Sequence, residues 1–148
     1  RPARLSDAGA FAPLEEQDPA RWDHNLIQAA LPHLRRAIAG APQARRTFQA
    51  RLQALWCGRQ SLAQPAPWPQ VLALYDEMLA VSDDPFVRLN RAVALGALGR
   101  AAEALQSLQL FATPALEANP MWNAVRADLL VRTGQPAAAQ AAYAAALA

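Results

Sequence analysis

Apolar residues recur at intervals of three or four along most of the chain, the spacing that gathers side chains on one face of an α-helix. Several segments open with Asp, Thr or Asn before a proline. This pair indicates the start of a helix, because such side chains cap a helix and proline fits its first position. No stretch alternates β-branched or aromatic residues with polar ones, as a half-buried strand would. The pattern predicts an all-α protein of about seven helices. They are expected at residues 19–40, 43–59, 69–81, 85–98, 101–111, 120–133 and 136–148.

The last two helix pairs repeat one another, since residues 89–108 align with residues 124–143. A tetratricopeptide repeat has a period of about 34 residues, and its two helices cross at small side chains. Both copies carry alanine at those positions: Ala92, Ala104, Ala127 and Ala139. We therefore expect antiparallel helix pairs stacked as a TPR-like superhelix, clearest over 84–111 and 119–148. A generic helical bundle with coincidental alanine similarity is the alternative.

The first helix and the segment before it differ from this pattern. Residues 1–17 contain Gly9 and Pro13 and show no apolar period, which is typical of an arm or linker. Residues 18–148 then form the helical domain, a length suited to one hydrophobic core. Pro32 is expected to kink the first helix.

Composition narrows the possible partners and the compartment. All 14 basic residues are arginine, they are dispersed, and the net charge is only +2, so solvated helix faces are favoured over a nucleic-acid site. One cysteine, Cys57, excludes an internal disulfide and a cysteine metal cluster. No apolar run approaches the roughly 18–20 residues that span a bilayer, so we expect a cytoplasmic protein without membrane contact. The missing initiator Met suggests a piece of a longer protein.

The sequence offers little for catalysis. His24 and His33 lack a second ligand at metal spacing, and Cys57 has no partner nearby in sequence. Glycine-rich phosphate loops and nucleophile elbows are missing, and the carboxylates fall in the arm, caps and turns. We expect no catalytic residue, no metal, no cofactor and no enzymatic activity.

Two sets of residues are candidates for binding other proteins. The first lies where the arm meets the first helix and combines charge, hydrogen-bonding groups and an aromatic ring, although a capped helix start with a buried Trp explains it equally well. Its members are Gln17, Asp18, Arg21, Trp22 and Asp23. The second set would line a peptide groove formed by the first helices of the two repeats. Its members are Phe86, Leu89, Val93, Met121, Ala124 and Asp128.

Polar residues within those same first helices must either face a groove or pair internally. They are Asn90, Arg91, Arg126 and Asp128. Arg91 and Arg126 occupy equivalent positions in the two repeats, which favours a structural role for both.

Five short motifs occur in a set order along nearly the whole chain. They are Arg1-Pro-Ala-Arg4, Glu16-Gln17-Asp18 with Arg21-Trp22-Asp23, Leu74-Tyr75-Asp76, Leu89-Asn90-Arg91-Ala92-Val93-Ala94 and Arg126-Ala127-Asp128-Leu129-Leu130. With these motifs in this order, the chain resembles the C-terminal extension of a class of bacterial extracytoplasmic-function (ECF) RNA polymerase sigma factors. That extension carries tetratricopeptide-like repeats. That family has roughly D-Q-D-R-x-x-W-D near the first helix. This chain departs from the pattern at Glu16 and Pro19, so no contact through a basic side chain at 19 is expected.

The resemblance implies that the parent protein directs RNA polymerase to promoters through domains lying before Arg1. The extension would regulate them through contacts with the sigma core of the same polypeptide or with RNA polymerase, and DNA would be touched only by the missing domains. It would replace the membrane-bound anti-sigma control usual for such factors. The alternative is a stand-alone TPR-like adaptor that binds a peptide or regulatory protein. Two helical domains encoded upstream would favour the first interpretation.

Overall fold

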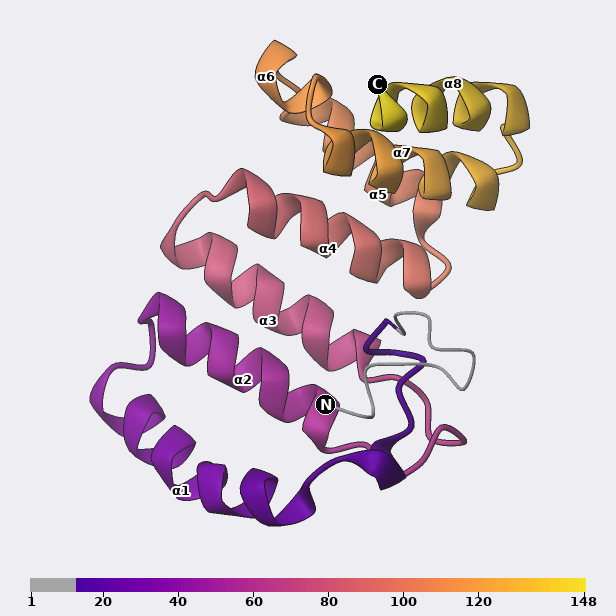
Figure 1. The fold of residues 1–148 in the computed structure, drawn as a ribbon. Coiled ribbons are helices and arrows are strands. Elements are labelled where there is room, and N and C mark those ends of the chain that lie inside the picture. The colour runs from indigo at the N-terminus through magenta and orange to yellow at the C-terminus, as the bar shows by residue number, and fades with distance from the viewer. Residues whose placement is uncertain (1–12) are drawn as a thin grey trace. The chain divides into compact units, whose positions relative to one another are not determined.

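The computed structural model describes residues 13–148, and all regular structure in that range is helical, which confirms the all-α prediction (Figure 1). The chain divides within α3 into two compact units, Arg1–Leu74 and Tyr75–Ala148. The elements are the 3-10 helix η2 (Pro19–Arg21) and the α-helices α1 (His24–Gly40), α2 (Arg45–Cys57), α3 (Trp68–Val81), α4 (Pro85–Ala97), α5 (Ala101–Leu110), α6 (Pro114–Glu117), α7 (Pro120–Arg132) and α8 (Pro136–Leu147).

Four helical elements start at a polar cap followed by proline, as the sequence predicts. In each case the side-chain oxygen of the cap accepts a hydrogen bond from a backbone amide two or three residues later. The capping residues are Asp18, Asp84, Thr113 and Asn119. Thr113 begins only the single turn α6, which the apolar pattern did not reveal.

The first predicted helix is divided, contrary to the continuous span expected from 19 to 40. Asp18 caps only η2, and the backbone is extended at Trp22 and Asp23. Asp23 then caps α1, its Oδ1 accepting from the Leu26 amide at 3.0 Å. Two aspartates each provide an N-cap here, and the second accepts from an amide in the first turn of the long helix. Pro32 lies inside α1, which continues through it to Gly40.

The second unit shows the repeat in its backbone. Gly99 and Gly134 both have positive φ, 76° and 73°. The amides of the following residues bond to Leu95 O and Leu130 O, each at 2.9 Å. This is the Schellman closure of a helix, in which glycine tolerates the left-handed conformation. Because the closures lie at equivalent positions, the two helix pairs turn in the same way.

Small residues let the helices of the second unit approach closely. The four alanines predicted at helix crossings, Ala92, Ala104, Ala127 and Ala139, are all at most 2% exposed. A Cβ added at Gly96 of α4 would lie 2.7 Å from Leu129 Cδ2 on α7. Leu95, Leu108 and Leu129 are among the largest fully buried side chains of the described residues. The arrangement is compatible with a helical repeat.

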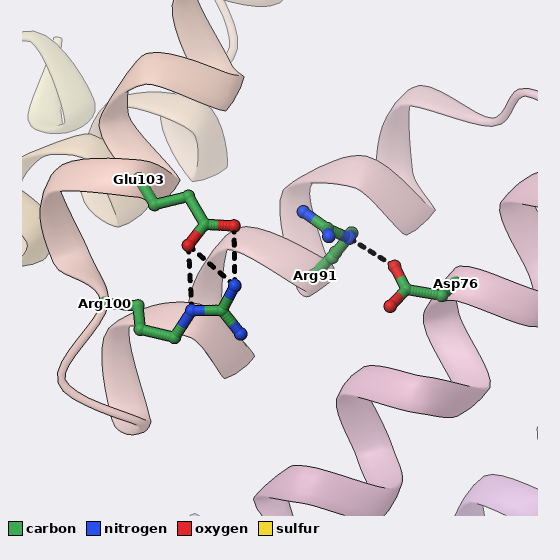
Figure 2. A network of polar contacts seen from close by, with 4 residues as sticks. All are labelled: Asp76, Arg91, Arg100 and Glu103. Atoms are coloured by element: carbon green, nitrogen blue, oxygen red, sulfur yellow. Dashed lines mark hydrogen bonds and ion pairs between the residues drawn. The ribbon is translucent and has the colours of Figure 1, made fainter.

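Figure 2 shows two ion pairs of the second unit, one between two helices and one at the first turn of α5. Arg91 Nε on α4 donates to Asp76 Oδ1 on α3 at 2.6 Å. Arg100, the residue before α5, donates through Nε and Nη2 to the two carboxylate oxygens of Glu103, each at 2.8 Å. The side chains are partly exposed, so we expect each pair to contribute at most about 1 kcal/mol.

We expect Gly99→Ala and Gly134→Ala each to lower the free energy of unfolding by about 1 kcal/mol, because alanine is strained at positive φ. Neither glycine has a neighbour that a methyl group would meet, so strain alone would act. Urea unfolding followed by Trp fluorescence measures the change. Gly40→Ala is the control, since Gly40 lies in a helix with the same open space and should become slightly more stable. Equal effects at all three glycines would contradict the assignment.

Candidate protein-binding sites

The predicted interdomain set lies on one continuous segment that is largely engaged in the fold. Gln17 is 9% exposed and Pro19 is almost fully buried. The carboxylates of Asp18 and Asp23 accept hydrogen bonds from backbone amides. Arg21 is exposed and Trp22 is half-buried. The docking role of this set remains a prediction.

A buried arginine, missed by sequence reasoning, holds this segment in place. Arg59 is 6% exposed and donates to three carbonyl oxygens, from Nη1 to Glu15 at 2.8 Å and from Nη2 to Gln64 at 3.0 Å and Leu62 at 3.4 Å. Within residues 13–148 its Nε has no hydrogen-bond partner. Arg59 therefore ties the end of the predicted arm to the loop after α2. The only sequence signal was its place directly after Gly58 at a helix end.

Two tryptophans add contacts where Glu15 meets the residues after α2. The Trp68 indole Nε1 donates to Glu15 Oε1 at 3.2 Å. Its ring meets the buried Trp56 edge to face, with centroids 5.1 Å apart. Glu15 is thus bonded through both its backbone carbonyl and its side chain to residues after α2, although the sequence suggests an arm or linker there.

The predicted repeat groove is only partly a surface. Phe86 is 55%, Met121 61% and Val93 37% exposed, and Ala124 and Asp128 are half-buried. Leu89, however, is 6% exposed and belongs to the core, so its assignment to the groove is wrong. It lies about 60° around α4 from Phe86, which turns it toward the interior. The exposed apolar pair Phe86 and Met121 occupies equivalent positions in the two repeats.

Polar residues predicted beside the groove have different roles. Asp128 Oδ2 accepts from Arg132 Nε at 2.7 Å on the same helix. Arg132 also donates from Nη1 to Gly96 O at 3.3 Å, which connects α7 to α4. Arg91 is ion-paired with Asp76, whereas the equivalent Arg126 is exposed. The ion pair supports a structural role for Arg91. The exposure of Arg126 gives no such support.

A third surface was not anticipated. α1 and α2 enclose an apolar groove of about 560 Å³, and every lining residue except His33 and Gln53 is apolar. Cys57 lies at its α2 wall, where burial raises the pKa of the thiol. The sequence signal was the stripe of apolar residues along α1.

The described part of the chain, from Pro13 onward, contains no group of three or more His, Cys, Asp or Glu side chains arranged to hold a metal ion. None of the helices in that part is both long and apolar enough to cross a membrane.

Comparison with known proteins gives a partial match at the front of the chain. Residues 1–38 are similar to a family of unknown function, DUF6596. The chain is also 31% identical over 93 residues, 63% of its length, to an uncharacterised protein of Rhizobium meliloti (strain 1021). That match covers 22% of the relative, so the chain spans about a fifth of the length of that protein. No solved structure matches the chain.

We expect Arg59→Met to lower the free energy of unfolding by about 2 kcal/mol, because the hydrocarbon stem remains but three carbonyls lose part-buried, charge-assisted hydrogen bonds. Urea unfolding followed by tryptophan fluorescence measures this. Arg46→Met makes the same change at an exposed position and should alter stability by less than about 0.5 kcal/mol. If both variants lower the free energy of unfolding equally, Arg59 does not hold Glu15 to the loop after α2.

Proposed function

We propose that this chain is a regulatory protein-interaction domain of an ECF-type RNA polymerase sigma factor. In this role it modulates transcription initiation through contacts with the sigma core, with RNA polymerase, or with both. The five sequence motifs resemble the C-terminal extension of that family. A chain that spans about a fifth of its Rhizobium relative is consistent with a domain acting within a longer polypeptide.

The observation that carries a protein-binding function is the exposure of large apolar side chains at equivalent repeat positions. Phe86 and Met121 are more than half exposed, although both follow a capped proline at the start of a helix. Exposed apolar groups on helical repeats are typical of surfaces that bind other polypeptides. This observation by itself suits the alternative, a TPR-like adaptor that binds a peptide of an unrelated partner.

The front segment favours the sigma-factor interpretation. Arg59 and Trp68 both bond to Glu15, so the segment that leads to Arg21 and Trp22 is held by tertiary contacts. Arginine and tryptophan contribute disproportionately to binding energy at interfaces, and a segment already held in place binds at a lower entropic cost. We assign the contact with the sigma core to this pair.

The test measures binding of the fluorescently labelled chain to the sigma core domains and to the RNA polymerase core enzyme of the source bacterium. We expect at least one of them to bind and Arg21→Glu to weaken that binding about tenfold. Circular dichroism checks that this variant stays folded. Arg126→Glu is the control, because it makes the same charge change at an exposed site of the second unit.

Two results would contradict the proposal. The first is no binding to either protein. The second is binding that Arg21→Glu leaves intact and that a Phe86→Ser, Met121→Ser double variant abolishes, since this would place the contact on the repeats and favour the adaptor.

A further inference from the structure

The groove between α1 and α2 is an apolar surface that the first unit leaves open. α1 has 17 residues and none of them is buried, whereas the shorter α4 buries six. Leu26 is 68% exposed and Ile38 39% exposed. A helix whose apolar stripe remains this open carries surface that a partner can cover.

The groove has the shape and chemistry to receive a helix. Its α1 wall includes the large apolar residues Ile27, Leu31 and Leu34. Its α2 wall includes the small residues Ala50 and Ala54. Small residues on one wall allow another backbone to approach closely, and large apolar residues on the other supply contact area. An amphipathic helix binds such a groove through apolar residues spaced at i, i+3, i+4 and i+7.

The charge around the groove selects among possible occupants. Between His24 and Tyr75 the chain has no Asp or Glu, so all 12 of its acidic residues lie elsewhere. Five of the six arginines in this stretch lie on α1 and α2, and the sixth, Arg59, is buried after α2. Arg36 Nη2 lies 2.8 Å from Nδ1 of His33, a groove residue. Arg46 is exposed and lies one turn before Ala50 on the same face of α2.

A second copy of the chain, docking through the same face, would bring arginine against arginine. A nucleic-acid backbone would meet an apolar lining in place of the basic stripe that tracks phosphates. Carboxylates beside an apolar stripe match both the lining and the charge of this segment.

We propose that the α1/α2 groove binds an amphipathic helix of a partner protein whose polar side is rich in Asp and Glu. The apolar stripe of that helix packs on the groove, and its carboxylates face the arginines of α1 and α2. This inference does not depend on the sigma-factor proposal, which concerns Arg21 and Trp22.

The test uses a labelled peptide of about 18 residues, long enough to follow α1 at roughly 1.5 Å per residue. It alternates leucine and glutamate with helical spacing, and the comparison peptide carries lysine in place of glutamate. Fluorescence anisotropy measures the dissociation constants. Because Cys57 is the single cysteine and lines the groove, the rate of its alkylation by N-ethylmaleimide reports occupancy directly.

We expect the glutamate peptide to bind at least about tenfold more tightly than the lysine peptide, to lose affinity with added salt, and to slow alkylation of Cys57. Ala50→Glu places a carboxylate in the groove at an exposed helix position and should weaken binding about tenfold. Gln49→Glu adds the same charge on the same helix outside the groove and should change affinity less than about threefold.

Equal binding of the two peptides, or binding without protection of Cys57, would overturn the proposal. So would a dimer in sedimentation experiments that Ala50→Glu dissociates, because the occupant would then be a second copy. Tighter binding of anionic lipid vesicles or duplex DNA than of the glutamate peptide, again lost in Ala50→Glu, would assign the groove to those ligands instead.

Discussion

A pair of helices has an apolar face that it cannot bury by itself, and this constraint governs the second unit. Alanine at the crossing positions and Gly96 against Leu129 bring the helices close enough to exclude water. The glycine closures at Gly99 and Gly134 turn each pair so that its second helix returns along the first. Close packing and identical turns together account for the repeated geometry, and they leave equivalent outer positions, such as Phe86 and Met121, exposed in both copies.

The first unit meets the same constraint differently. Its second helix, α2, is followed by a proline-rich loop. Carbonyl oxygens of that loop accept hydrogen bonds from the buried guanidinium of Arg59. Arg59 donates to carbonyl oxygens of both Glu15 and the loop after α2. The apolar side of α1 lines the groove. The first unit buries Phe48, Trp56, Val71, Leu72 and Leu74 but leaves the apolar stripe of α1 available to partners. One proposed contact of this unit uses that stripe, and the other uses Arg21 with Trp22.

The candidate sites were only partly predictable from sequence. The exposure of Phe86, Val93 and Met121 follows from the repeat register, but the same register wrongly placed Leu89 on the surface, since a rotation of about 60° around a helix separates core from solvent. Asp18 was predicted to cap one helix from 19 to 40 but caps only η2, and the role of Asp23 as the cap of α1 depends on the extended backbone at Trp22 and Asp23. The one sequence signal of Arg59, its place after Gly58 at a helix end, did not reveal that its guanidinium is buried.

The sequence by itself determined the helical class, most helix boundaries and the repeat. Those features depend on local rules: apolar spacing, Xaa-Pro caps and glycine at positive φ act within a few residues. Only the tertiary structure decided which faces are covered. Whether an apolar stripe becomes core, as on α4, or the wall of a groove, as on α1, depends on which helices pack beside it. The bond from Arg59 to Glu15 likewise joins residues far apart in the chain, a pairing that no local pattern encodes.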